Sequence, residues 1–365
     1  MNFLEALQHC IEKNLIFAAY RLPHSDAIRL VVQKDPEPQK VNISSSIFDQ
    51  SGFIVSPFIE NKQNPSYLIQ PDLNYISTDY ENFNELTSLS TVQNCEDDFD
   101  GGIITKSEFI SQVEEYKKAI SENRFEKAVI SRIKVIDRSY RLKITEIFQL
   151  LCSSYSNAFI YVFNVANQLW MGATPEPLIC SHKNELSTAA LAGTRQYNAE
   201  NLNLHNWDKK EKDEQGMVSL YIENTFKNLN INIFQKEGPY TKKAGNLIHL
   251  RTDFTLNYSE TNTNLGDLVK ALHPTSAVCG LPKKEAMEFI INIEKHKRGF
   301  YAGFLGPINL DEKVLLFVNL RCMRVLKDCL ILYIGAGITS GSIPEDEWAE
   351  TEFKADTLLS IIHKV

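Results

Sequence analysis

Hydrophobic and polar positions follow two spacings along the chain, and together they predict many strands and a few long helices. After TKSE at 105–108, which has the form of a capping box, Phe109 and Val113 recur at helical spacing. KAVISRIKVI at 127–136 is rich in β-branched residues and predicts a strand, as does CLILYIGAGI at 329–338. Because strands and helices do not alternate regularly, the pattern favours an α+β fold over a doubly wound α/β sheet.

Another apolar stripe predicts a helix over residues 209–228. Met217, Val218 and Tyr221 form the stripe, and Glu214 lies three, four and seven residues before them on the same face. An acid in that position is either a solvent-exposed carboxylate at the rim of the core or a buried carboxylate with a metal or another cation as its partner. The pattern by itself leaves both interpretations open.

The C-terminal stretch GAGITSGSIPEDEWAETEFK, residues 335–354, joins a glycine-rich turn to a helix. Glu347, Glu350 and Lys354 fall on one stripe of that helix, which is typical of a solvated surface with an i,i+4 ion pair. A phosphate loop is disfavoured, because the third glycine comes one place too late for GxGxxG. Alternatively, the two acids and Glu214 hold Mg²⁺, while glycine N–H groups and Lys354 bind a substrate carboxylate.

Composition changes this picture mainly by exclusion. The 365 residues carry a net charge of −8 and no long basic stripe, which argues against nucleic acid or an anionic membrane surface as a partner. The seven cysteines form no CxxC pair, so neither structural zinc nor a disulfide framework is indicated. The N-terminus lacks the features of a signal peptide, and no apolar run reaches the ~18 residues of a membrane span. A cytoplasmic protein with reduced thiols is predicted.

Six stretches occur in an order that resembles one enzyme family. They are GATPEPLI (172–179), LAGTRQ (191–196), ALHPTSAVCGLP (271–282), RGFYAG (298–303), NLRCMRV (319–325) and GAGITSGSIPEDEWAETEFK (335–354). The ordered set is similar to the motifs of the chorismate-utilising enzymes, which include isochorismate synthases, salicylate synthases, anthranilate synthase large components and aminodeoxychorismate synthases. The resemblance covers roughly residues 105–362.

The resemblance implies a single α+β unit, with two antiparallel β-sheets in a sandwich and helices outside. Residues 1–100 match only loosely and would be a divergent N-terminal part of this unit, and residues 101–365 would be the catalytic region. The acidic stretch NCEDDFDGG at 94–102 is interpreted as the linker between them. The family also implies chorismate as the substrate and a monomer.

The same resemblance implies Mg²⁺ as the cofactor. Glu350 matches a metal-ligating glutamate, Glu347 matches a nearby acid that supports the metal, and Glu214 matches the other ligand. The family commonly has histidine after this last acid, whereas the present chain has Gln215 in KDEQGMV. Asp213 is therefore an alternative ligand if the register differs.

Substrate-binding positions also follow from the resemblance rather than from spacing. Arg321 and Lys354 match residues that hold substrate carboxylates, and Tyr301 matches an aromatic residue that hydrogen-bonds the pyruvyl carboxylate. Thr194 and His273 match positions that line the pocket, although a lone histidine is more often a satisfied core residue. Main-chain N–H donors are expected from Gly335, Ala336 and Gly337.

Members of the family differ in their nucleophile, which is water or ammonia, and the residues of this chain favour water. Lys127, in FEKAVISR, falls where water-using members carry a base, and Glu176, in GATPE, matches the general acid. A lysine activates water only as the neutral amine, which requires desolvation or a neighbouring cation such as Arg132. Glu176 must be protonated, so burial has to raise its pKa. The implied reaction adds water at ring carbon 2 of chorismate and releases the 4-hydroxyl, reversibly.

The expected function is therefore isochorismate synthesis, with menaquinone biosynthesis favoured over a siderophore route. Three alternatives stay open: a salicylate synthase, an ammonia-using anthranilate or aminodeoxychorismate synthase, and a protein that binds chorismate without turnover. The ammonia-using alternative normally needs an amidotransferase partner, and Lys127 argues against it. The altered KDEQ sequence at 212–215 is the best support for the non-catalytic alternative.

Overall fold

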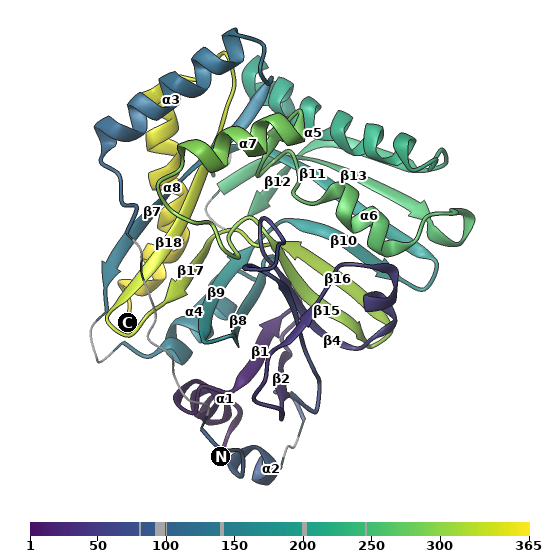
Figure 1. Cartoon of the computed structure of the whole chain (residues 1–365), viewed down its shortest axis with the longest axis vertical. Coiled ribbons are helices and arrows are strands. Elements are labelled where there is room, and N and C mark those ends of the chain that lie inside the picture. The colour runs from purple at the N-terminus through teal and green to yellow at the C-terminus, as the bar shows by residue number, and fades with distance from the viewer. Residues whose placement is uncertain (80–81, 92–98, 100, 139–141, 199–202, 245–246) are drawn as a thin grey trace.

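The computed structural model describes the chain except for residues 80–81, 92–98, 100, 139–141, 199–202 and 245–246. Most of the predicted linker at 94–102 therefore lies outside the described residues. The described strands form two nine-stranded sheets, and their pairings are antiparallel. Figure 1 shows the sheets with helices around them, so the predicted α+β fold with two antiparallel sheets is confirmed.

The first sheet contains strands from both ends of the chain. Its order is β14 (Gly280–Leu281), β7 (Lys127–Asp137), β18 (Cys329–Ile338), β17 (Cys322–Val325), β9 (Gln168–Thr174), β8 (Phe159–Val165), β1 (Ile16–Arg21), β2 (Ile28–Gln33) and β6 (Leu73–Ile76). The order of the second sheet is β12 (Gln235–Ala244), β13 (Leu247–Asn257), β11 (Glu185–Gln196), β10 (Pro177–His182), β16 (Lys313–Val318), β15 (Phe304–Leu310), β4 (Gly52–Ser56), β5 (Ser66–Ile69) and β3 (Gln39–Val41). Strands from the first 100 residues thus extend both sheets.

The helices lie outside the sheets. They are α1 (Phe3–Glu12), α2 (Asn84–Thr87), α3 (Lys106–Ser121), α4 (Ile144–Ser154), α5 (Lys209–Asn228), α6 (Leu265–Leu272), α7 (Lys283–Ile293) and α8 (Pro344–Ile362), with short 3₁₀ turns at Ser45–Asp49, Leu204–Asn206 and Tyr258–Glu260. The predicted capping box of α3 is present, because Thr105 accepts from the N–H of Glu108 and its own N–H donates to that carboxylate. No helix in the described part of the chain is long and apolar enough to span a bilayer.

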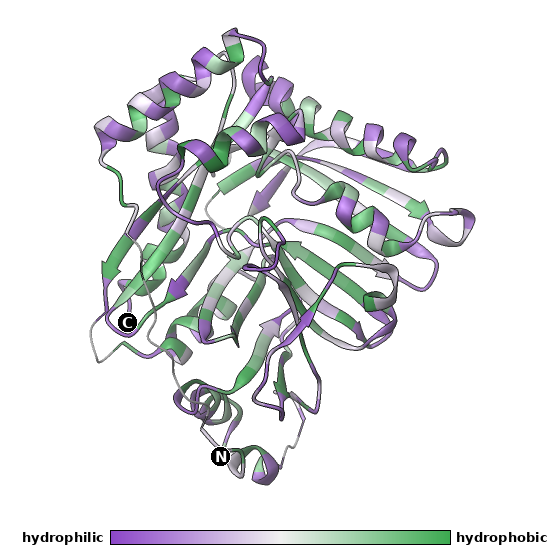
Figure 2. Ribbon diagram, viewed as in Figure 1, coloured by the Kyte–Doolittle hydropathy of each residue, from purple (hydrophilic) through white to green (hydrophobic). Residues whose placement is uncertain are grey.

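The strands have continuous apolar sequences because both faces of the sheet are buried. In β1, Ala18 and Tyr20 face the core between the sheets, whereas Phe17 and Ala19 face the core under α1, α4 and α8. The two sheets meet through aromatic rings, since Phe159 of β8 stacks on Phe317 of β16 at 4.2 Å between centroids. Figure 2 shows hydrophobic colour along much of the inner strands, whereas hydrophilic and hydrophobic colours alternate along the outer helices.

Candidate active site

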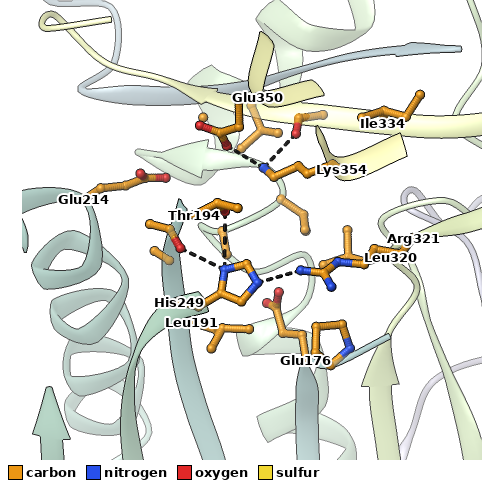
Figure 3. Close-up of a pocket in the computed structure, with 18 of the residues that line it drawn as sticks. Glu176, Leu191, Thr194, Glu214, His249, Leu320, Arg321, Ile334, Glu350 and Lys354 are labelled. Atoms are coloured by element: carbon orange, nitrogen blue, oxygen red, sulfur yellow. Dashed lines mark hydrogen bonds and ion pairs between the residues drawn. The ribbon is translucent and has the colours of Figure 1, made fainter. Parts of the chain in front are cut away.

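One cavity receives side chains from both sheets and from two helices. Strand β18 of the first sheet and strands β11 and β13 of the second sheet line it, and α5 and α8 complete it (Figure 3). It contains about 760 Å³ of space that protein atoms do not fill, part of it open to solvent. The predicted site residues in its lining are Glu176, Thr194, Glu214, Tyr301, Arg321, Gly335, Gly337, Glu350 and Lys354. Residues from five of the six quoted motifs, together with Glu214, are thereby brought together.

Two glycines keep the cavity face of β18 open. A Cβ at position 335 would lie 2.5 Å from the hydroxyl oxygen of Tyr301, and a Cβ at position 337 would lie 2.7 Å from Oε1 of Glu214. Both distances are shorter than van der Waals contact, so any larger residue would displace these polar groups. Tyr301 is 2% exposed, and burial raises its pKa, so its hydroxyl stays a hydrogen-bond donor.

Backbone N–H groups of β18 point alternately toward β7 and away from it, and this corrects the prediction for Ala336. The carbonyl of Gly335 accepts a 2.9 Å hydrogen bond from Nζ of Lys354, and Ser131, opposite Gly335 in β7, donates its N–H to Glu294 instead. Gly335 therefore directs its backbone groups away from β7. Because successive residues of a strand direct these groups to opposite edges, Ala336 directs its N–H toward β7 and not toward the cavity.

Glu176 occupies the short connection between β9 and β10, with Pro175 before it and Pro177 after it. The residue is 5% exposed and its carboxyl group faces the cavity (Figure 3). Burial raises the pKa of Glu176 to about 7, against the opposing charges of Lys127 and Lys354. This is the direction required of a carboxylic acid that donates a proton near neutral pH.

Lys127 is fully buried at the first position of β7. Its Nζ lies 2.9 Å from Oε1 of Glu214, so the ammonium has an anion as its partner. The suggestion that Arg132 is its neighbouring cation is wrong. Five positions along a strand place two side chains on opposite faces, and Arg132 instead donates to Thr351 and lies 4.0 Å above the ring of Trp348.

The three carboxylates that were expected to hold Mg²⁺ are each paired with a lysine. The pairs are Glu214–Lys127 at 2.9 Å, Glu347–Lys210 at 2.7 Å and Glu350–Lys354 at 2.7 Å. Within the described residues, no three His, Cys, Asp or Glu side chains lie close enough together to hold a metal as they stand. The donors nevertheless suit Mg²⁺ chemically, since all are carboxylate oxygens and each already binds a cation.

Arg321 belongs to a polar chain that sequence reasoning missed in part. Its Nη2 lies 2.6 Å from Nε2 of His249, whose Nδ1 lies 2.8 Å from the carbonyl oxygen of Gly193 (Figure 3). Burial, followed by the charge of Arg321, lowers the pKa of His249 well below its ordinary value, so the ring is neutral. A neutral ring that donates from Nδ1 and accepts at Nε2 satisfies both contacts. Thr194 lies beside it, with Oγ1 3.3 Å from Nδ1.

His273 does not belong to the cavity lining, contrary to its predicted role. Its Nε2 lies 3.0 Å from the carbonyl oxygen of Pro57, and its ring meets the ring of Phe304 edge-on at 5.0 Å. Burial lowers its pKa to about 4. The same segment reaches the cavity through Ala277 and Val278 instead. His273 is therefore the satisfied core histidine that was the alternative to a pocket role.

Comparison with known proteins gives a consistent picture. A family profile described as "Chorismate binding enzyme" matches residues 50–363. Isochorismate synthase MenF of Bacillus subtilis is 26% identical over 266 residues, which are 71% of this chain and 56% of that protein. MenF of Haemophilus influenzae is 33% identical over 215 residues, which are 56% of this chain and 48% of that protein. The chain thus spans about half the length of these curated relatives.

Solved structures share the fold. The menaquinone-specific isochorismate synthase MenF from Escherichia coli superposes with a TM-score of 0.80 at 20% identity, over 99% of this chain and 91% of that chain. Anthranilate synthase component I from Streptococcus pneumoniae superposes with a TM-score of 0.67 at 17% identity, over 94% and 90%. At these identities the superpositions establish the architecture alone.

Proposed function

Since the chain belongs to the family of chorismate-binding enzymes, we propose that it is an isochorismate synthase that converts chorismate reversibly to isochorismate with Mg²⁺. The observation that supports the proposal is that Glu176 lines the cavity, whereas Lys127 is not in the lining but reaches it through Glu214. Among the neighbouring charges, Lys127 has the largest lowering effect on the pKa of Glu176.

The proposed chemistry has one base and one acid. Lys127 accepts a proton from water as its oxygen bonds to ring carbon 2, the ring double bonds shift, and the hydroxyl at carbon 4 leaves as water with the proton of Glu176. On the return reaction the two residues exchange roles. Lys127 must be neutral to begin, so the ammonium group that is paired with Glu214 first has to lose a proton to solvent.

The remaining residues bind and orient the substrate. Arg321 is held by neutral His249 and offers its other guanidinium donors to a carboxylate, with the hydroxyl of Tyr301 as a further donor. We propose that Glu214, Glu347 and Glu350 hold the metal, which neutralises the ring carboxylate and the charge that develops on it. Lys354, released from Glu350, would then face the substrate.

The test is a Mg²⁺-dependent assay that identifies every product. Purified protein is incubated with chorismate and followed by proton NMR, with released pyruvate measured by a coupled dehydrogenase. Isochorismate without pyruvate supports the proposal, and salicylate with pyruvate identifies a salicylate synthase. Chorismate binding without turnover in saturating Mg²⁺ identifies a non-catalytic binding protein. Chelation of the metal has to abolish turnover.

The metal assignment has its own test in Glu214→Ala. The variant should need much more Mg²⁺ for the same turnover, whereas Asp213→Ala, its exposed neighbour on α5, should not. An unchanged requirement in Glu214→Ala would show that the register of this ligand is wrong.

We also propose a role in menaquinone biosynthesis. Complementation of a menaquinone-deficient strain, compared with complementation of a siderophore-deficient strain, would test it.

A further inference from the structure

Lys210 has no part in the proposed chemistry, yet it is paired with one of the three carboxylates that are proposed to hold the metal. It belongs to the first turn of α5, four residues before Glu214, and its Nζ is 2.7 Å from Oε1 of Glu347 on α8. The side chain of Glu347 is only 1% exposed, whereas that of Lys210 is 38% exposed. A partly exposed lysine thus reaches inward to a buried acid on a different helix.

The electrostatic surroundings of Lys210 extend beyond this one pair. Burial opposes charge on Lys210, but the charges of Glu347, Glu350 and Glu214 outweigh burial and raise its pKa. Burial and the charge of Glu350 raise the pKa of Glu347, while Lys210 opposes the rise. Lys210 is thus in direct contact with Glu347 alone, while the charges of Glu350 and Glu214 act on it without contact.

We infer that Lys210 is a tethered cation that competes with Mg²⁺ for Glu347, one of the three proposed ligand carboxylates, and thereby weakens metal binding in the absence of substrate. The inference rests on the proposed function, because it takes these carboxylates to be the metal ligands. It also accounts for their spacing in the structure, since carboxylates that pair with separate lysines need not converge on one point.

The physical reason is that a buried carboxylate is costly without a counter-charge. In the metal-free protein Lys210 supplies the counter-charge of Glu347, beside a hydrogen bond from the side chain of Ser342. A metal that takes over Glu347 must first displace the ammonium and then tolerate its charge a few ångströms away. Like charges at such a separation repel even in water, and they repel more strongly beside a protein wall.

The other two lysines differ from Lys210 in this respect. Lys127 and Lys354 each pair with a single predicted ligand and each has a role in the proposed reaction, so replacing them would disturb catalysis directly. Lys210 can be replaced without removing a group that touches the substrate. It is therefore a positioning residue for the metal, and its effect has to be measured on metal binding itself.

The experiment is calorimetric titration of the full chain with Mg²⁺ alone, without chorismate. Lys210→Met should tighten the dissociation constant of Mg²⁺ by about 5- to 10-fold, since the competing charge is removed. Lys212→Met removes the same charge from an exposed position on α5 and should stay within about twofold of the wild type. Lys210→Arg, which keeps the cation, should resemble the wild type.

A purely structural role would give the opposite sign. If Lys210 only supported α5 against α8, Lys210→Met would bind Mg²⁺ no better than the wild type, or more weakly, and the inference would be overturned. Should Lys210→Met fail to fold, Lys210→Gln is also uncharged, keeps a hydrogen-bond donor for Glu347, and must show the same tightening. In metal-free buffer either neutral variant should melt below the wild type, and Mg²⁺ should restore its Tm.

Failure of this inference can be told apart from failure of the proposed function. If the wild type converts chorismate with Mg²⁺ and the neutral variants bind the metal no more tightly, only the competition is refuted. If neither the wild type nor the variants bind Mg²⁺ or turn over chorismate, the metal assignment falls and the competition falls with it.

Discussion

One buried carboxylate, Glu176, lines the candidate active site, and another, Glu294, supports its wall through Arg298; their surroundings are opposite. Glu294, with a side chain 3% exposed, accepts hydrogen bonds from the N–H and hydroxyl of Ser131 and from two nitrogens of Arg298. Within the described residues, the carboxyl group of Glu176 makes no such bond. Burial raises its pKa to about 7. Glu294 is a satisfied anion that joins elements, and Glu176 is an acid whose carboxyl group has no hydrogen-bond partner in the described part of the chain.

The difference shows how one fold uses buried charge for two purposes. Arg298, held by Glu294, donates to the carbonyls of Val129 and Val278, and both of these residues line the cavity. The Glu294 region thus stabilises the wall. The carboxyl group of Glu176 lacks the hydrogen bonds and the ion pair that stabilise Glu294, and it can donate a proton. Such an arrangement is typical of functional sites. The predictions below test this division.

Replacement of Lys127 should have the largest effect. Lys127→Ala is expected to lower the rate of chorismate turnover by about 10⁴-fold, because the general base is removed, while chorismate binding stays measurable. The matched control is Lys134→Ala on the same strand, where the lysine pairs with Glu352 away from the cavity. It should retain turnover within a few-fold. Near-normal rates in Lys127→Ala would refute the base assignment.

Glu176→Gln should follow, with a loss of about 10³-fold in turnover. The amide has nearly the same shape, so the fold and chorismate binding should change little, and circular dichroism and a binding titration check this. A variant that loses binding as much as turnover would show that Glu176 binds the substrate and does not donate a proton.

Glu294→Gln should affect stability instead. The change leaves the buried guanidinium of Arg298 without its counter-charge, and breaking such a pair costs about 3 kcal/mol of the free energy of unfolding. Urea denaturation measures this loss. Turnover by the folded variant should fall less than 10-fold. A loss of turnover comparable to that of Glu176→Gln would erase the distinction between the two carboxylates.

The pH dependence should also separate the two carboxylates, with an effect spread over a range of pH. The folded-state pKa of Glu176 is raised from an ordinary 4.5 to about 7, so the stability linked to its proton is full below pH 4.5 and is lost as pH rises through 7. Relative to Glu176→Gln, the wild type should lose roughly 3 kcal/mol of unfolding free energy over this window. Forward turnover should likewise decline above pH 7. A constant difference between the two proteins across this range would contradict the raised pKa.

Much of this protein could be predicted from its sequence because local chemistry decides it. The capping box at Thr105 and the β-branched run that begins at Lys127 act over a few residues, and the structure contains both elements there. The glycines at 335 and 337 were expected near the substrate, and both line the cavity. The ordered motifs indicated the family, because each motif is a short continuous stretch that can be recognised in the sequence alone.

The partners of the charged groups were decided only by the tertiary structure. Which lysine pairs with Glu347, which face of β7 carries Arg132, and whether His273 or His249 reaches the cavity all depend on contacts between segments far apart in the chain. Sequence patterns specify which residues face inward, because burial follows periodicity. They do not specify what each inward residue meets, because that is set by the packing of two sheets and two helices around one cavity.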